Sequence, residues 1–284
     1  MNFSEEQSIQ CGSKQLNLSV PVVMGIINLT PDSFHDGGMF NTVDELQAKA
    51  ETLLFEGATI LDIGAVSTRP GAVLLSPDEE VERLIGPLKL LRQKYPDTII
   101  SIDTYRKDVA AAAIAEGADI INDISGGMID SNMINYMCSQ TAAYVLMHMQ
   151  GTPETMQQNP VYEDVVREIG SFFITQLDHF KHAGKHNIIL DPGFGFGKSV
   201  DHNFKLLDAI NEYTHYGYPV LAGVSRKSMI NRVLGTAPAN ALNGTTVINT
   251  IALLQGANIL RVHDVKPAVE AIKLVAQFKE SNSR

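Results

Sequence analysis

The chain has 284 residues, of which 44% are hydrophobic and 19% charged, and its formal net charge is −10. This composition supports a packed core, and the acidic balance argues against broad binding to nucleic acid or to an anionic membrane surface. No apolar stretch approaches the ~20 residues that cross a bilayer, and the polar, acidic start does not resemble a secretory signal. The two cysteines, Cys11 and Cys138, have neither metal-ligand nor redox spacing. They indicate free thiols in a reducing compartment, and therefore a cytoplasmic protein.

Eight short apolar runs rich in β-branched residues recur along the chain, and polar residues lie at their ends. They are Val22–Asn28, Thr59–Gly64, Ile99–Asp103, Ile120–Asp123, Tyr144–His148, Ile188–Asp191, Pro219–Ser225 and Ile259–His263. Parallel strands buried on both faces are continuously apolar, and their alternation with helices implies βαβ units. We therefore predict an α/β fold, a (β/α)8 TIM barrel, whose active site lies where the strands end. We expect a single domain over residues 1–284, with a barrel core at about 20–280 after a short N-terminal lead-in.

The stretches between these runs predict the helices. We expect them over Val43–Glu56, Pro77–Lys94, Lys107–Glu116, Asp130–Ser139, Tyr162–Ala183, Asp201–Asn211, Lys227–Leu234 with Ala239–Gln255, and Lys266–Lys279. Residues 1–19 are expected to form the lead-in, as a hairpin across the bottom of the barrel. The long connections 29–41 and 65–76 follow strands and so belong to the active face, whereas 150–160 shows no obvious chemistry.

Polar side chains gather where the predicted strands end. Asp103, Asn122 and Asp191 would offer carboxylate and amide groups to a heterocycle that carries amino and ring N–H donors, and Lys227 could donate a further hydrogen bond. Any one of these residues could instead bind only neighbouring loops. The remaining polar residues at this rim are Asn28, Asp62, Asp123, His148, Ser225, Arg226, Arg261 and His263.

Two further patterns at the same rim favour ligand binding. Asp191 opens a Gly-rich segment, 191–198, in which glycines allow close backbone approach and two aromatic residues could cover a flat ligand. Arg261 and His263 share one face of the last strand and could clamp a phosphate, although a solvated pair is the simpler alternative. His148, flanked by large apolar residues, is interpreted as a structural histidine.

The chain resembles the dihydropteroate synthases over about residues 22–275. The resemblance rests on eight segments in order, including Met24–Phe34, Ser67–Gly71, Ser101–Thr104, Ile121–Ile124, Leu146–Gly151, Asp191–Lys198, Ser225–Ser228 and Arg261–Asp264. It implies a transferase that joins 6-hydroxymethyl-7,8-dihydropterin diphosphate to para-aminobenzoate and releases diphosphate in folate biosynthesis. It also implies a Mg²⁺ cofactor, a homodimer, small-molecule substrates rather than nucleic acid or membrane, and sensitivity to sulfonamides.

The resemblance also assigns roles to residues of this chain. The pterin would bind to Asp103, Asn122, Met147, Asp191, Phe196 and Lys227. The diphosphate would bind to Arg69, Arg261, His263 and, through Mg²⁺, to Asn28. The aminobenzoate would bind to Phe34, Thr68, Pro70, Phe196 and Ser228. The catalytic residues would be Asp103, Asp191, Lys227 and Asn28.

Three other functions are compatible with parts of this pattern. A pterin-dependent methyltransferase domain would share the Asp/Asn/Asp set but would need no diphosphate clamp. A pterin-binding module without catalysis would explain a departure at Val66, where the family usually has an acidic residue. A phosphate-binding aldolase would need a Schiff-base lysine on a strand, and no apolar run contains a lysine.

Replacing Val66 by glutamate restores the usual acidic residue beside Arg69. We expect the natural chain to be active with altered kinetics, and Val66→Glu to change the KM or kcat for dihydropteroate formation, because a carboxylate would alter the charge of the loop. Steady-state kinetics of the two proteins test this. Identical KM and kcat values for the two proteins would show that residue 66 has no influence on the reaction.

Overall fold

Eight parallel strands form the centre of the computed structural model, which describes residues 8–29, 39–64, 75–152, 154–156 and 159–282. They pair in the order β8-β7-β6-β5-β4-β3-β10-β9, and a parallel bridge between Leu190 and Val220 joins the two ends of the sheet. The predicted (β/α)8 barrel is therefore confirmed. The strands are β3 (Val22–Asn28), β4 (Ile60–Gly64), β5 (Ile99–Asp103), β6 (Ile120–Asp123), β7 (Ala143–Met147), β8 (Ile188–Asp191), β9 (Leu221–Ala222) and β10 (Ile259–Val262).

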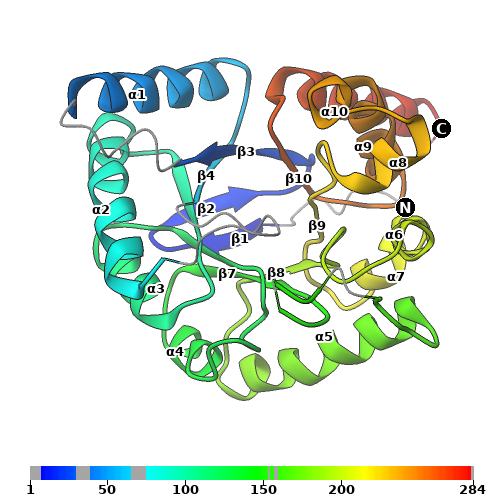
Figure 1. Ribbon diagram of the computed structural model, residues 1–284, viewed down its shortest axis with the longest axis horizontal. Coiled ribbons are helices and arrows are strands. Elements are labelled where there is room, and N and C mark those ends of the chain that lie inside the picture. The colour runs from blue at the N-terminus through cyan, green and yellow to red at the C-terminus, as the bar shows by residue number, and fades with distance from the viewer. Residues whose placement is uncertain (1–7, 30–38, 65–74, 153, 157–158, 283–284) are drawn as a thin grey trace.

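The helices surround this barrel (Figure 1). They are α1 (Met39–Phe55), α2 (Pro77–Lys94), α3 (Lys107–Ala115), α4 (Met133–Cys138), α5 (Val165–His182), α6 (Val200–Asp208), α7 (Ile210–Thr214), α8 (Ser228–Leu234), α9 (Leu242–Leu254) and α10 (Val265–Ser281). Helix α2 begins where its capping signal predicts, because Ser76 and Glu79 form a reciprocal capping box. Among the described helices, none is long and apolar enough to span a membrane.

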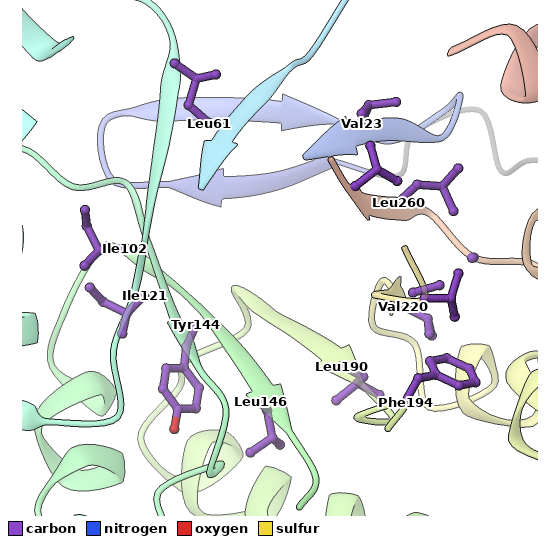
Figure 2. Packing of buried hydrophobic residues seen from close by; sticks show 14 of the residues in the cluster. Val23, Leu61, Ile102, Ile121, Tyr144, Leu146, Leu190, Phe194, Val220 and Leu260 are labelled. Carbon is purple, nitrogen blue, oxygen red and sulfur yellow. The ribbon is translucent and has the colours of Figure 1, made fainter. Parts of the chain in front are cut away.

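Alternate residues of each strand build two separate hydrophobic clusters. Outward-facing side chains such as Val23, Leu61 and Ile102 pack against the helices in the larger cluster (Figure 2). Their neighbours Met24 and Ile60 belong to a second cluster inside the barrel, near the amino ends of the strands. Both faces of the sheet are therefore buried, which explains why the strands are continuous apolar runs.

An antiparallel hairpin covers the amino end of the barrel. Strands β1 (Ser8–Cys11) and β2 (Lys14–Asn17) pair with each other, and Ile9, Cys11 and Leu16 pack into the inner cluster. Within the described part of the lead-in, residues 8–17 thus form the predicted hairpin, which closes the barrel bottom with apolar side chains.

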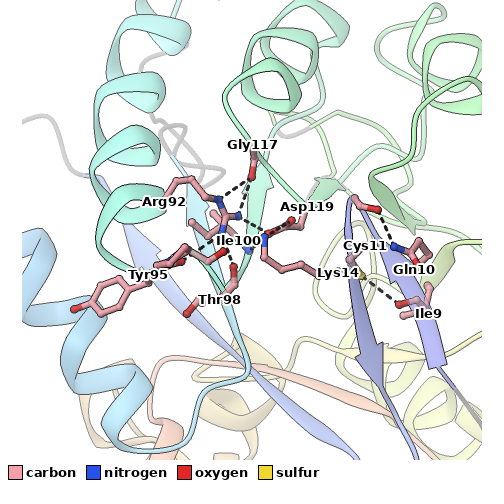
Figure 3. Close-up of polar contacts among 12 residues, drawn as sticks. Ile9, Gln10, Cys11, Lys14, Arg92, Tyr95, Thr98, Ile100, Gly117 and Asp119 are labelled. Carbon is pink, nitrogen blue, oxygen red and sulfur yellow. Dashed lines mark hydrogen bonds and ion pairs between the residues drawn. The ribbon is translucent and has the colours of Figure 1, made fainter.

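Asp119, which lies just before β6, ties this hairpin to the barrel. Its carboxylate accepts hydrogen bonds from Lys14 Nζ of β2 at 2.8 Å, Arg92 Nη2 of α2 at 2.5 Å and the Ile100 N–H of β5 at 2.9 Å (Figure 3). Arg92 also donates to the carbonyl of Gly117 at 2.8 Å. One buried carboxylate therefore connects four elements at the bottom of the barrel.

Strand β9 is shorter than the predicted run Pro219–Ser225. The N–H of Val220 is bound by the side-chain oxygen of Asn258 at 2.9 Å, and Val220 accepts from the N–H of the same residue at 2.8 Å. The carbonyl of Val220 also accepts from the N–H of Ile259 of β10 at 3.2 Å, but only Leu221 and Ala222 are in register with that strand.

We expect Asp119→Asn to lower the free energy of unfolding by about 3 kcal/mol, because it removes one partner of a buried ion pair and leaves two cations uncompensated. Urea denaturation measures this loss. The control is Lys94→Met, which breaks the exposed Lys94–Glu51 pair at 3.7 Å and should cost less than about 1 kcal/mol. Equal losses in the two variants would contradict a structural role for the Asp119 contacts.

Candidate active site

Strand alternation places a polar layer inside the carboxyl end of the barrel. In β5, Ile99 belongs to the inner cluster whereas Ile100 and Ile102 belong to the outer one, so Ser101 and Asp103 face inward. The same alternation holds in the other strands. The inward-facing polar residues of this layer are Asn28, Asp62, Ser101, Asp103, Asn122, Asp191 and Arg261.

Arg261 of β10 reaches two carboxylates from neighbouring strands. Its Nε donates to Asp62 at 2.7 Å, and its Nη2 donates to Asp103 at 2.7 Å. Asp62 is fully buried and also accepts from Ser101 Oγ at 2.6 Å and Asn122 Nδ2 at 3.3 Å. This network therefore joins Arg261, which is expected at the diphosphate, to Asp103 and Asn122, which are expected at the pterin.

The sequence placed Asp62 at the rim without a role, whereas the structure makes it a central member of this network. It lies two residues before the end of β4, on the inward face, as Ser101 does in β5. The two-residue period of the strand was the available signal. Its partner Arg261 is 199 residues away in sequence, so only barrel closure brings them together.

Burial controls the ionisation of this network. It raises the pKa of Asp103 to about 7, with a further increase from the charge of Asp62, against the opposing effect of Arg261. Burial disfavours the charge of Arg261, but Asp62 and Asp103 raise its pKa above the usual range. Asp103 therefore changes near neutral pH between a carboxylate, which only accepts hydrogen bonds, and an acid that can donate one.

Asp191 and Lys227 meet beside the Gly-rich segment that follows β8. Lys227 Nζ donates to the carbonyl of Phe194 and lies 4.7 Å from the centre of the Phe196 ring. Burial raises the pKa of Asp191, against the charge of Lys227. Burial lowers the pKa of Lys227 to about 8, against the charge of Asp191. An aromatic face, an acceptor and a donor are thus within reach of one bound ring.

The residue before Lys227 fixes this arrangement through an unusual backbone. Arg226 has φ 57°, a left-handed conformation that residues with a Cβ rarely adopt. Its guanidinium forms a fork with Asp264, at 2.9 and 2.7 Å, and its N–H donates to Thr245 Oγ1 at 3.0 Å. The turn begins α8 at Ser228, with Lys227 as the residue that precedes the helix.

His263 lies beside Ser225 at the end of β10, with its Nδ1 3.0 Å from Ser225 Oγ. Burial and then the charges of Arg261 and Arg226 lower its pKa to about 4. The imidazole is therefore neutral at pH 7 in this structure, and Arg261 carries the positive charge of the pair. An anion bound here would oppose that lowering.

An apolar wall adjoins the polar layer. One of its members, Met156, is buried and comes from the connection 150–160, for which the sequence predicted no function. This connection therefore contributes an apolar side chain beside the polar layer. The wall consists of Tyr105, Ile124, Met147, Met149 and Met156, with Phe196 packed against them.

Four residues expected at the site, Phe34, Thr68, Arg69 and Pro70, lie outside the described residues, as does Val66. The other predicted site residues all lie at the carboxyl end of the barrel, and contacts join Asp103, Asn122 and Arg261 through Asp62. The arrangement suits a planar heterocycle with several N–H groups, because acceptors converge beside apolar and aromatic surfaces.

Comparisons with known proteins show the family of this chain. The profile of the family described as "Pterin binding enzyme" matches residues 24–263. Dihydropteroate synthase from Escherichia coli K12 is 44% identical over 262 residues, which cover 92% of each chain.

Two solved structures have the same fold. Dihydropteroate synthase from Yersinia pestis, in complex with a sulfonamide drug, is 39% identical with a TM-score of 0.89, covering 96% of this chain and 100% of that one. The Burkholderia cenocepacia enzyme, complexed with 7,8-dihydropteroate, is 38% identical with a TM-score of 0.86, covering 97% and 98%. The chain therefore belongs to the pterin-binding enzyme family and, within it, to the dihydropteroate synthases, which are transferases built on a (β/α)8 barrel.

Proposed function

We propose that this chain condenses 6-hydroxymethyl-7,8-dihydropterin diphosphate with para-aminobenzoate to give 7,8-dihydropteroate and diphosphate. One observation carries the proposal: Asp103, Asn122 and Asp191 face the same polar layer, and Lys227 lies above the ring of Phe196 beside it. A pterin has ring N–H and amino donors, a carbonyl and a flat face, and each finds a complementary group here. The dihydropteroate bound by the Burkholderia relative supports the same ligand class.

In this proposal the pterin binds between Asp103, Asn122 and Asp191, with Lys227 donating to its carbonyl or a ring nitrogen. Met147 and Phe196 pack against it. The Gly193 N–H donates to the Asp191 carboxylate at 2.7 Å and so fixes its orientation for contact with the pterin.

The diphosphate binds near Arg261, His263 and Arg69. Arg261 connects this end of the site to the pterin end, since the same guanidinium binds Asp103. Approach of the diphosphate to Arg261 therefore also affects the carboxylate that binds the pterin.

Mg²⁺ is the cofactor that we propose. Among the described residues, no group of three His, Cys, Asp or Glu side chains could hold a metal. Mg²⁺ often binds through one or two protein oxygens together with substrate phosphates and water, which fits the exposed amide of Asn28 at the end of β3. When bound, the ion would neutralise charge on the departing diphosphate.

The aminobenzoate binds beside Ser228, the first residue of α8, and Phe196, with Phe34, Thr68 and Pro70 from the long connections. Sulfonamides resemble this substrate and would compete for the same place. The Yersinia relative, solved with such a drug, supports this subsite.

The reaction proceeds by dissociative substitution. The bond between the pterin methylene carbon and oxygen breaks first, and its electron pair leaves with the diphosphate. Asp103 and Asp191 stabilise the resulting cation electrostatically. The neutral aromatic amine then attacks the carbon and releases a proton to solvent, so no strong base is needed.

We also propose a homodimer in the cytoplasm. Helix α9 contacts both α8 and α10, and these three helices carry large exposed apolar side chains, which typify interfaces. Free Cys11 and Cys138 fit a reducing compartment. The exposed apolar residues on helices α8, α9 and α10 are Val233, Leu234, Leu242, Val247, Leu254, Leu274 and Phe278.

Diphosphate release and dihydropteroate formation, followed together, test the function. We expect both to require para-aminobenzoate and Mg²⁺, and Asp191→Ala to lower kcat/KM by roughly 10³-fold because the cation loses a carboxylate. Asp208→Ala, on the outer helix α6, is the control and should retain activity. Pterin binding without turnover would identify a binding module instead, and near-normal activity of Asp191→Ala would exclude its role.

The pKa values predict a maximum in pterin affinity. The Kd for 6-hydroxymethyl-7,8-dihydropterin should fall as the pH rises through about 7, where Asp103 becomes a carboxylate, and increase again above about 8, where Lys227 loses its proton. Titration calorimetry from about pH 6 to about pH 9 measures this. Asp103→Asn should bind weakly and lose the acidic limb, whereas a Kd that is constant with pH would contradict the assignment.

A further inference from the structure

A buried lysine at the carboxyl end of the barrel has no part in the reaction described above. Lys198 ends the Gly-rich segment and is only 5% exposed. It forms no ion pair with any carboxylate in the part of the chain that the structure describes. A buried lysine without such a partner is costly, so its hydrogen bonds must account for its place.

Lys198 connects two neighbouring segments of the barrel rim. Its Nζ donates to the carbonyl of Phe196 at 2.9 Å and to the carbonyl of His148 at 3.2 Å, and it lies 3.2 Å from His148 Nδ1. Burial lowers the pKa of Lys198 well below its usual range, and these acceptors satisfy the N–H donors of its amino group. The end of β7 is thereby joined to the segment that follows β8.

The fit between these two segments is close. A Cβ on Gly193 would lie 1.9 Å from the carbonyl oxygen of His148, and one on Gly197 would lie 2.5 Å from the carbonyl oxygen of Gln150. Both glycines also have positive φ, 70° and 66°. The Gly-rich segment therefore lies directly on the backbone that extends β7, and its path depends on contacts between them.

The imidazole of His148 is held in place from the other side. Its ring lies 5.1 Å from that of Phe172 in an edge-on arrangement and 6.1 Å from that of Tyr162, whose hydroxyl donates to the carbonyl of Gly197 at 2.9 Å. Burial and then the charge of Lys198 lower the pKa of His148 to about 3, so the ring is neutral and its Nδ1 is able to accept. The histidine is thus a fixed anchor for Lys198.

We propose that Lys198 is a positioning residue for the pterin site, acting through the backbone carbonyls of Phe196 and His148. The segment that it fixes carries the Phe196 ring beneath Lys227 and the Phe194 carbonyl to which Lys227 donates. It also begins at Asp191, whose carboxylate is oriented by the Gly193 N–H. This inference rests on the proposed function, because it assigns the segment to pterin binding.

A second buried lysine provides a matched control. Lys185 is also 5% exposed and donates to two backbone carbonyls, those of Gln140 at 2.9 Å and Ala142 at 2.8 Å. It lies before β8, at the amino end of the barrel, whereas Lys198 lies after it. Lys198→Met and Lys185→Met remove the same chemical group from opposite ends of one strand.

The test compares stability with pterin binding in these two variants. We expect both to lower the Tm, since each leaves buried carbonyls without donors. Only Lys198→Met should raise the Kd for 6-hydroxymethyl-7,8-dihydropterin about tenfold or more, and lower kcat/KM about 100-fold, because small misplacements of binding groups are costly. The same Kd and kcat/KM in both variants, at comparable Tm, would overturn the proposal.

Lys198→Gln keeps the test decisive if the methionine variant fails to fold. The glutamine side chain is one atom shorter than that of lysine and keeps two N–H donors, so this variant should fold. Its Kd for the pterin should lie between the wild-type value and a complete loss of binding. A Kd equal to the wild type would overturn the positioning role.

Calorimetry separates this inference from the proposed function. If the wild type binds the pterin but forms no dihydropteroate, the synthase function fails while the comparison of Lys198→Met with Lys185→Met still decides the positioning role. If the wild type binds no pterin, both proposals are wrong.

Discussion

The ion pairs of Arg261 with Asp62 and Asp103 connect strands β10, β4 and β5 at the carboxyl end of the barrel. Three carboxylates, Asp62, Asp103 and Asp191, face the same interior of the barrel, where burial and then the charge of Asp62 raise the pKa of Asp103. A single guanidinium with its donors in a fixed fork satisfies two of them at once. Because Asp62 in turn orients Asn122, the geometry of the polar layer follows from this one cation.

The two ends of the barrel use opposite chemistry on the same strands. Near the amino ends the inward residues are apolar and the β1–β2 hairpin covers them, whereas near the carboxyl ends they are polar. The apolar layer and the hairpin supply packing, so the polar layer does not have to contribute to the core. This division allows charged groups to gather at one end without loss of a continuous hydrophobic core.

Most of the fold could be predicted from sequence, because strands buried on both faces leave continuous apolar runs. The length of β9 could not, since the predicted run continues past Leu221 and Ala222, the two residues that pair with β10. The position of Asp103, Asn122 and Asp191 at one rim followed from the ends of the strands.

The hydrogen-bond partners of these side chains could not be predicted from the sequence. Arg261 was expected beside a bound phosphate, but the sequence did not indicate that it also binds two carboxylates, a contact that exists only once the barrel closes. The burial of Lys198 depends on the path of a segment whose glycines adopt positive φ, and composition does not specify that path.

Because β9 is short, the wall of the barrel has fewer strand pairs there than at β3 and β4. Between β8 and β9 one bridge, Leu190 to Val220, joins the strands, and β9 pairs with β10 over two residues. Between β3 and β4 five residue pairs are in register. Val220, Leu221 and Ala222 are nevertheless fully buried. The wall that carries Lys227 therefore depends more on side-chain packing, whereas the wall that carries Asp103 has longer ladders of backbone hydrogen bonds.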